Sequence, residues 1–390
     1  MAQEFRLTSK NFVLVCVATF LYFGSFYLLM PTLPQYVDML GGTHGQIGLV
    51  VGVFSVASVI TRPGLGLLAD RWGRRRVMLF GAGFFCLLFP LYGLLQAIVP
   101  LYLLRIAHGL AHASFLAASA AYIADLAPPE RRGEVMGVYG AASVVAMALF
   151  PAMGIDIIHA TNSFPVLFTY STVAAGAAFL AVVLAGEVPA PEGGKRAASL
   201  LAVGSRRTVL IPALTLGAGA TAYGTVIAFL PVFAPQQGLP HFGIFFTVYA
   251  AATLASRLFA GRLSDRYGRR RVILPFMALL TVGVFSLPFL DSLLLLAFIG
   301  VTFGLGFGAF MPTLNALVVD KTPSPERGSA LGFFTSFMDV GIAFGSVGLG
   351  LIGEQAGLAT MFVVAGGVLV LGIIVFAVFT EKDIPPGAGR

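Results

Sequence analysis

Residues 66–77 read GLLADRWGRRRV, and residues 261–272 repeat the pattern as GRLSDRYGRRRV. Each copy lies between two long apolar stretches, so a short charged loop joins the same pair of apolar segments in each half of the chain. A pattern that recurs at corresponding places is typical of an internal duplication. The sequence therefore predicts two related halves, each containing the same charged turn.

The composition is that of a membrane protein. Hydrophobic residues make up 58% of the 390 residues and charged residues only 11%, about half the charge of an average soluble domain, and the mean hydropathy is +0.92. A helix needs about 20 apolar residues to cross a bilayer. About twelve stretches of this length occur, and together they predict an all-α membrane protein. They lie near 11–36, 46–68, 77–98, 101–123, 135–158, 164–186, 208–234, 242–263, 272–290, 293–318, 329–352 and 358–380.

The basic residues are distributed unevenly over the connecting loops. Every second loop contains lysine or arginine, and the loops between them contain neither. Because cytoplasmic loops are enriched in these residues, we expect both termini in the cytoplasm, and the cytoplasmic (inner) membrane of a prokaryote as the location. The net charge of +7 therefore requires no nucleic-acid partner.

The duplication extends beyond the two loops. Arg62 precedes the first loop at the spacing at which Arg257 precedes the second, and Asp125 and Asp320 are each followed by a Pro-Glu-Arg run. Parallel repeats in membrane proteins are related by an axis along the membrane normal. We expect two pseudo-symmetric six-helix bundles, 1–186 and 208–390, joined by a cytoplasmic linker at 187–207 that is rich in proline, glycine, alanine and basic residues.

The run Gly66-x-Leu68-Ala69-Asp70-Arg71-x-Gly73-Arg74-Arg75 resembles the loop signature between the second and third helices of the major facilitator superfamily. Its recurrence extends the resemblance over essentially the whole chain. The resemblance implies a secondary active transporter that works by alternating access and is not an enzyme. It also implies that loop contacts latch the cytoplasmic side shut. The expected gating residues are Gly66, Asp70, Arg71, Gly73, Arg74, Gly261, Asp265, Arg266, Gly268 and Arg269.

Each type of residue in the loops has a physical reason to be there. Gly66 and Gly261 permit close approach of helices, whereas Gly73 and Gly268 suit a tight turn. The aspartates can pair with nearby arginines or face the N-terminal end of a helix, where negative charge is favoured. The alternative is that these charges only set the topology and hold the loop at the lipid headgroups.

The fourth apolar stretch contains a cluster of polar residues. Arg105, His108 and His112 are spaced to lie on one helical face, and we expect them to point into a central cavity together. Leu104-Arg105 followed by Gly109 resembles the fourth-helix signature of proton-coupled members of the superfamily, with His108 where glutamine is common. The resemblance implies that Arg105 helps to transmit a coupling proton or orients the substrate.

The two histidines allow more than one role. They can titrate near neutral pH and couple protons to transport, or they can make hydrogen bonds that are only structural. A metal site is disfavoured because no acidic residue or cysteine nearby in sequence completes a ligand set. No cofactor is therefore expected, and the proton is the expected coupling ion.

Arg62 and Arg257 form a second constellation. A pseudo-twofold axis would bring them to opposite sides of one cavity, where arginine favours an anionic substrate because it binds carboxylates through two parallel hydrogen bonds. The segment Arg62–Gly66 also resembles one that surrounds a substrate arginine in carboxylate-transporting branches of the superfamily. The alternative is that both side chains extend to water at the cytoplasmic helix ends.

Two further polar residues lie inside apolar stretches. Asp339 is near the middle of the eleventh stretch, and intramembrane charges are costly enough to require a function. It is either a carboxylate that carries the proton or a fixed partner of Arg257 or Arg105. Asn315 is a candidate for hydrogen bonding to solute in the cavity.

These residues favour a proton-coupled transporter that exports a small organic solute. The stretch Phe150–Ile155 keeps only part of the glycine and proline pattern of drug antiporters in the family. A carboxylate transporter that uses Arg62 and Arg257 is the alternative, and a membrane sensor without transport activity is a remote one. No phosphate-binding loop or nucleophile with a base indicates an enzyme. The expected partners are the lipid bilayer and the solute, and the architecture suits a monomer.

Overall fold

The computed structural model describes residues 7–128, 131–188, 200–323 and 326–380. Part of the expected linker, 189–199, and the residues Pro129, Glu130 and Pro325 of the Pro-Glu-Arg runs lie outside the described residues. The described residues are nearly all helical and contain no strand. Among them, twelve helical spans are long and apolar enough to cross a membrane. The predicted all-α membrane fold is therefore confirmed.

The described residues of the first half form seven helices. The first span is interrupted, because α1 ends at Leu29 and α2 begins at Leu33 with Pro34 in its first turn. The other spans of this half are single helices. The helices are α1 (Lys10–Leu29), α2 (Leu33–Met39), α3 (His44–Trp72), α4 (Arg74–Leu94), α5 (Ile98–Leu126), α6 (Arg132–Thr161) and α7 (Phe164–Leu184).

The second half repeats this series after the short helix α8 (Leu200–Gly204). The eleventh span of the chain, which lies in this half, contains a π-helical segment, η4, between two α-helices. The remaining elements are α9 (Arg207–Gln236), α10 (Gly243–Tyr267), α11 (Arg269–Ser286), η2 (Leu287–Phe289), α12 (Leu293–Asp320), α13 (Arg327–Ala343), η4 (Phe344–Gly348), α14 (Leu349–Ala356) and α15 (Leu358–Phe379).

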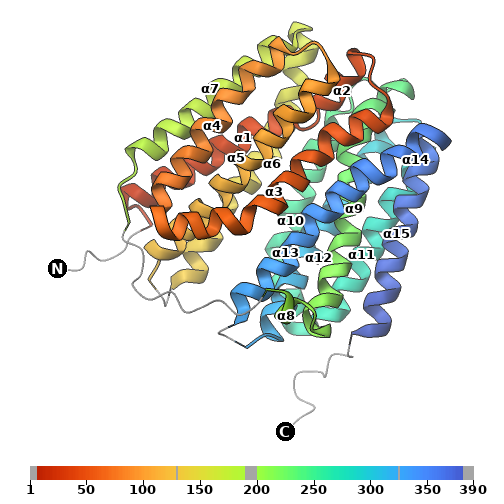
Figure 1. The fold of residues 1–390 in the computed structure, drawn as a ribbon. Coiled ribbons are helices and arrows are strands. Elements are labelled where there is room, and N and C mark those ends of the chain that lie inside the picture. The colour runs from red at the N-terminus through yellow and green to blue at the C-terminus, as the bar shows by residue number, and fades with distance from the viewer. Residues whose placement is uncertain (1–6, 129–130, 189–199, 324–325, 381–390) are drawn as a thin grey trace. The chain divides into compact units, whose positions relative to one another are not determined.

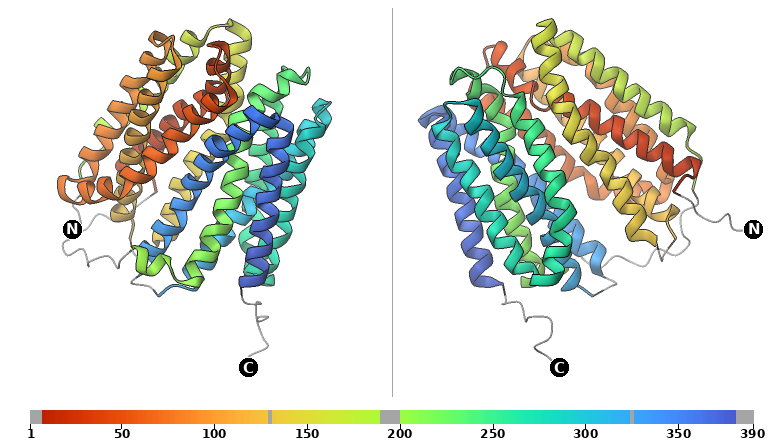
Figure 2. Two further views of the ribbon diagram at one scale, coloured as in Figure 1. Left: turned by 45° about the vertical axis from the view of Figure 1, so that its right-hand side comes forward. Right: turned by 180° about the vertical axis from the view of Figure 1, so that it is seen from behind.

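The chain divides into two compact units, and within each unit the helices lie side by side as a bundle (Figures 1 and 2). The same helix pairs pack in both. In the first unit α1 packs against α6 and α7, and α4 packs against α5 and α7; in the second, α9 packs against α13 and α15, and α11 packs against α12 and α15. This correspondence is the structural expression of the sequence duplication.

The unit boundaries do not follow the helices. One unit comprises 1–41 and 53–193, and the other comprises 42–52 and 194–390. The sequence predicts 42–52 as part of the first bundle, but these residues belong to the second unit by their contacts. The Gly45 amide donates to Glu354 Oε2 at 3.1 Å, and a Cβ on Gly48 would meet the Ser346 carbonyl oxygen at 2.0 Å.

Small residues allow the helices to pack this closely. A Cβ added to Gly109 of α5 would lie 2.4 Å from the Phe54 carbonyl oxygen of α3, and one added to Gly304 of α12 would lie 2.4 Å from that of Tyr249 in α10. Gly304 lies 195 positions after Gly109, and Tyr249 lies 195 positions after Phe54. The two charged loops are offset by the same number of residues. In lipid, such close backbone contact is a main source of helix association. The same crossing is therefore built twice.

Candidate functional site

The charged loops are single-residue turns. α3 ends at Trp72 and α4 begins at Arg74, so only Gly73 lies between the two helices, with φ +97°. Gly268 has the same place between α10 and α11, with φ +94°. Glycine adopts positive φ without the steric cost that a Cβ brings. These angles match the tight turn that the sequence indicates.

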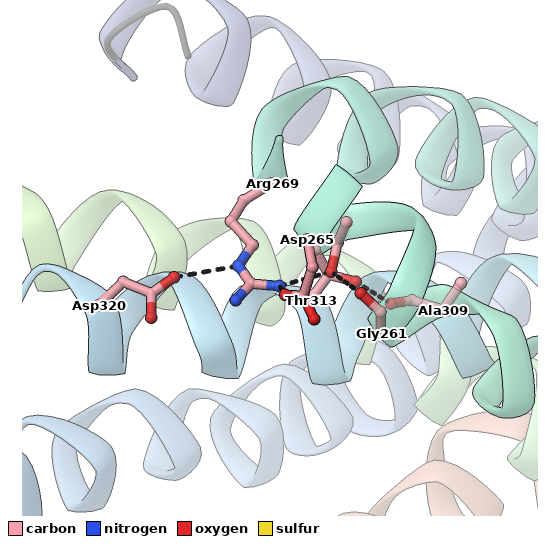
Figure 3. A network of polar contacts seen from close by, with 7 residues as sticks. Gly261, Asp265, Arg269, Ala309, Thr313 and Asp320 are labelled. Atoms are coloured by element: carbon pink, nitrogen blue, oxygen red, sulfur yellow. Dashed lines mark hydrogen bonds and ion pairs between the residues drawn. The ribbon is translucent and has the colours of Figure 1, made fainter. Parts of the chain in front are cut away.

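One arginine in each loop lies between two aspartates. Arg269 Nε lies 3.0 Å from Asp320 Oδ2, and its Nη1 lies 2.5 Å from Asp265 Oδ1 and 2.6 Å from Ser264 Oγ (Figure 3). Arg74 repeats the arrangement with Asp70 and with Asp125 Oδ2, the latter at 3.0 Å. Each loop is thereby fixed to α5 or α12 of its own unit.

The next arginine in each loop binds the end of another helix. Arg75 Nη2 donates to the Val183 carbonyl oxygen at 2.6 Å, and Arg270 Nη2 donates to that of Ala377 at 2.5 Å. These carbonyls belong to the last turns of α7 and α15, where backbone acceptors lack partners within the helix and the helix dipole is negative. The two neighbouring arginines thus connect their own helix to three other helices of the same unit at the loop.

The two loops differ in how far they are enclosed. The Asp125 side chain is 12% exposed, whereas that of Asp320 is 51% exposed. Because exposed ion pairs contribute little to stability, we expect the ion pair between Arg74 and Asp125 to stabilise its loop more than the pair between Arg269 and Asp320 does. The sequence shows the repetition of Asp125 and Asp320 but does not by itself predict their ion pairs, although each aspartate lies 51 positions after its arginine.

The remaining loop residues have looser surroundings. Arg71 and Arg266 are exposed, and the Arg266 guanidinium lies 5.3 Å from the ring centre of Tyr267. A Cβ at Gly66 or Gly261 would meet no atom within 4 Å. The prediction that these two glycines permit close helix approach is therefore wrong for this structure, because both lie on open parts of their helices.

Arg105 is a buried cation inside a membrane-spanning helix. It is only 5% exposed, and its guanidinium lies 4.3 Å from the ring centre of Phe54 on α3. It also interacts with the Tyr92 hydroxyl of α4. A cation over an aromatic face is attracted by the ring electrons, more strongly where water is excluded. Arg105 is thus held between α3 and α4.

His108 faces α4 and is fully buried. Its Nδ1 lies 2.9 Å from the Tyr92 hydroxyl, and its Nε2 lies 3.1 Å from the Phe85 carbonyl oxygen. Both ring nitrogens therefore have protein partners. This environment differs from the shared cavity that the helical spacing predicts, because the neighbouring helix α4 covers this position.

His112 lies one turn further along α5, among different rings. Tyr22 and Phe26 of α1 stack on its imidazole at centroid distances of 5.8 and 5.4 Å, and Phe54 lies 5.2 Å away. The side chain is 8% exposed, and its Nδ1 has no hydrogen-bond partner within the described part of the chain. Buried polar atoms are normally satisfied. The buried Nδ1 of His112 therefore leaves its hydrogen-bonding capacity unused among the described residues.

Arg62 lies on α3, near Arg105 and His112. It is half-buried, and its Nη2 donates to Ser58 Oγ one turn earlier at 3.1 Å. The charges of Arg62 and Arg105 both lie close enough to His112 to act on it electrostatically. The first unit thus brings together three of the predicted polar residues, which we call the cationic cluster: Arg62, Arg105 and His112.

At the duplicated positions, the second unit keeps the arginine that corresponds to Arg62, as Arg257, but not the polar residues of the fourth span. The residues 195 positions after Arg105, His108 and His112 are Gly300, Phe303 and Phe307. The ring of Phe303 lies 5.7 Å from that of Tyr249, and the ring of Phe307 lies 5.0 Å from that of Tyr223. The duplication therefore preserves the helix packing but not the polar chemistry.

The other predicted site residues belong to the second unit. Arg257 on α10 is exposed, whereas Asn315 on α12 and Asp339 on α13 are half-buried. Among the described residues, no group of three or more histidine, cysteine, aspartate or glutamate side chains is placed to hold a metal ion. The predicted polar residues of the second unit thus lie on three different helices.

Among the described residues, twelve spans in two bundles with matching helix pairs define a multi-pass membrane protein, and one bundle contains the cationic cluster. The chain belongs to the Major Facilitator Superfamily, whose family model matches residues 15–245 and 238–390. It is therefore a transporter and not an enzyme.

Known proteins of this family resemble the chain along nearly its whole length. It is 23% identical over 386 residues to the Staphylopine export protein of Staphylococcus aureus (strain Mu50 / ATCC 700699), with 96% of each chain covered. It is 26% identical over 375 residues to the Multidrug resistance protein MdtG of Rahnella sp. (strain Y9602), covering 92% of this chain and 91% of that one. A crystal structure of a variant of the nucleoside transporter NupG superposes with a TM-score of 0.79 at 15% identity, covering 95% and 100% of the two chains, which shows the common fold.

Proposed function

We propose that the protein exports a small organic solute across the cytoplasmic (inner) membrane of a prokaryotic cell in exchange for protons. Both termini lie in the cytoplasm, and the monomer is the working unit. The names of two relatives, an export protein and a multidrug resistance protein, support export. Transport proceeds by alternating access between the two bundles, as in other transporters built from repeats.

The observation that carries this proposal is the buried guanidinium of Arg105. A charge at this depth is costly and is retained where it serves transport. Around it, Phe54 supplies an aromatic face, and His112 supplies a ring nitrogen that has no hydrogen-bond partner among the described residues. An amphipathic solute requires this combination of apolar surface and a few polar groups.

The charged loops act as the cytoplasmic latch in this proposal. Asp70 and Asp265 are each bound to an arginine of their own loop, but more than half of each side chain remains exposed. Each carboxylate is therefore accessible for a further contact that forms and breaks during the cycle. The ion pairs with Asp125 and Asp320 hold each loop against its own unit during the cycle.

Asp339 is proposed as the carboxylate that carries the proton. Asp339→Asn is expected to retain counterflow exchange of solute but to lose uphill transport driven by a pH gradient, because asparagine cannot release a proton. The measurement is solute uptake by everted membrane vesicles, with and without the gradient. Asp291→Asn, an exposed residue outside the spans, is the matched control. Unchanged uphill transport in Asp339→Asn would exclude this carboxylate from coupling.

The cationic cluster favours an organic anion as the second candidate substrate class. The positive charges of Arg62 and Arg105 both lie near the His112 imidazole, and two guanidinium groups close together favour a negatively charged ligand. The test is a thermal-shift screen of the purified protein against benzoate-type carboxylates and lipophilic cations. A ligand that binds only the folded state raises the free energy of unfolding by about 2.7 kcal/mol at a hundredfold excess over its Kd. We expect carboxylates to stabilise the protein and Arg62→Gln to remove that effect, with a smaller change in Arg257→Gln. Stabilisation by cations that is indifferent to both variants would exclude the anion carrier.

A further inference from the structure

His108 occupies a closed hydrogen-bonded position between α4 and α5. Its ring packs against the rings of Phe85 and Phe89 at centroid distances of 4.3 and 4.8 Å, and none of its surface is exposed. Both ring nitrogens have partners on α4, namely the Phe85 carbonyl oxygen and the Tyr92 hydroxyl. The ring is therefore fixed in orientation by the neighbouring helix.

These partners determine where the imidazole proton lies. A backbone carbonyl can only accept a hydrogen bond, so the Nε2 that lies 3.1 Å from the Phe85 oxygen must be protonated. The Tyr92 hydroxyl can donate, so Nδ1 is satisfied as an acceptor in the neutral ring. A second proton on Nδ1 would place a buried cation beside the guanidinium of Arg105. The arrangement thus suits one neutral tautomer.

The hydrogen-bonded chain continues to the cationic cluster. The Tyr92 hydroxyl donates its proton to His108 and so presents its oxygen lone pairs to the guanidinium of Arg105, which only donates. The same guanidinium lies over the ring of Phe54. The orientation of Arg105 is therefore fixed by Tyr92 of α4 on one side and by Phe54 of α3 on the other.

We infer that His108 is a positioning residue that holds Arg105 through the Tyr92 hydroxyl, in a fixed neutral tautomer, and that it does not carry the coupling proton. The groups that face it are the hydroxyl of Tyr92 on α4 and, on its own helix, Arg105 and His112. None of them is a carboxylate that would stabilise an imidazolium. The transport role of Arg105 rests on the proposed function, but the state of the His108 ring does not.

Glutamine provides the matched substitution. Its side-chain NH₂ can donate to the Phe85 carbonyl oxygen while its side-chain oxygen accepts from the Tyr92 hydroxyl, which reproduces the neutral imidazole but cannot titrate. His108→Gln should therefore preserve solute exchange to within about twofold, with the same pH profile, because both hydrogen bonds are kept. Tyr92→Phe removes the connection to Arg105 and should slow exchange about tenfold, the effect of losing one hydrogen bond to a charged group.

The first experiment needs no solute. Nitrogen-15 NMR of the histidine-labelled protein in lipid nanodiscs is recorded from about pH 5 to about pH 8, where a free histidine titrates. The chain contains five histidines, and the resonances lost in His108→Gln identify those of His108. We expect protonated Nε2 and unprotonated Nδ1 throughout. Protonation of both nitrogens anywhere in this range, or a proton on Nδ1 alone, would overturn the assignment.

Exchange measurements test the positioning part separately. A pH profile that shifts in His108→Gln would show that the ring titrates during transport and would contradict the inference. Exchange by Tyr92→Phe at the parental rate would also contradict it, since Arg105 would then need no support from α4. Failure of export or of proton coupling would leave the NMR result unchanged, so the two proposals fail in different measurements.

Discussion

Arg105→Lys is expected to lower the rate of solute exchange about hundredfold while the protein stays folded, because lysine keeps the charge but loses a cation–π contact and a charged hydrogen bond worth together about 3 kcal/mol. The guanidinium is planar and can lie over Phe54 while one of its N–H groups donates to the Tyr92 hydroxyl. A lysine ammonium is a compact, strongly hydrated charge and cannot make both contacts.

The measurement is counterflow exchange in proteoliposomes, using the solute with the largest effect in the thermal-shift screen. Arg76→Lys is the matched control, because Arg76 is exposed beside the first loop. Apparent Tm values of both variants should stay close to that of the parent protein. If Arg105→Lys exchanges solute as fast as Arg76→Lys, charge alone is sufficient at this position, and the geometry around Phe54 has no part in transport.

Gly109→Ala is expected to destabilise the protein by about 2 kcal/mol, the usual cost of overpacking a tight interior. The added Cβ would lie 2.4 Å from the Phe54 carbonyl oxygen and 2.9 Å from the Ala57 Cβ, so α3 and α5 must separate. The corresponding Gly304→Ala should cost a similar amount, because its Cβ would lie 2.4 Å from the Tyr249 carbonyl oxygen. Gly109→Val should prevent stable folding.

Thermal unfolding in detergent measures this effect, which corresponds to a decrease of about 5 °C in apparent Tm. Gly140→Ala on α6 and Gly367→Ala on α15 are matched controls, because a Cβ at either position would meet no atom within 4 Å. In these controls alanine should be neutral or slightly stabilising, since it favours helix more than glycine does. Equal Tm values for Gly109→Ala and Gly140→Ala would show that α3 and α5 are not in close contact.

Much of the fold follows from the sequence because both of its signals are local. Apolar stretches of membrane-spanning length predict the helices, and the repeated loop predicts two related bundles. The π-helical segment Phe344–Gly348 has no such signal. The membership of 42–52 in the second unit was also hidden, because it depends on close contacts of Gly45 and Gly48 with residues about 300 positions away.

The site was predictable in composition but not in geometry. The spacing of His108 and His112 places both on one face of α5, yet one is enclosed by α4 and the other by rings from α1 and α3. Which helix covers a given turn is decided by tertiary packing and cannot be read from spacing. Gly66 shows the same limit, because the sequence predicts close helix approach there, whereas the structure has the close crossing at Gly109.

The ion pairs of Arg74 and Arg269 with the aspartates of α5 and α12 have a signal in the sequence. Asp125 and Asp320 follow Arg74 and Arg269 at equal spacing, and this repetition could have identified them as the ion-pair partners. The hydrogen bonds of Arg75 and Arg270 are different, because their acceptors are backbone carbonyls. Any residue supplies such an acceptor, so no side-chain pattern marks the contact.

Solute-dependent proton movement in proteoliposomes tests the proposed exchange most directly. The vesicles contain a pH-sensitive dye, and the solute found in the thermal-shift screen is added outside without an imposed gradient. Proton-coupled exchange predicts a pH change that requires both the solute and the protein and is absent in Asp339→Asn. Solute accumulation without any change in internal pH would contradict proton coupling and leave a carrier that moves its solute alone.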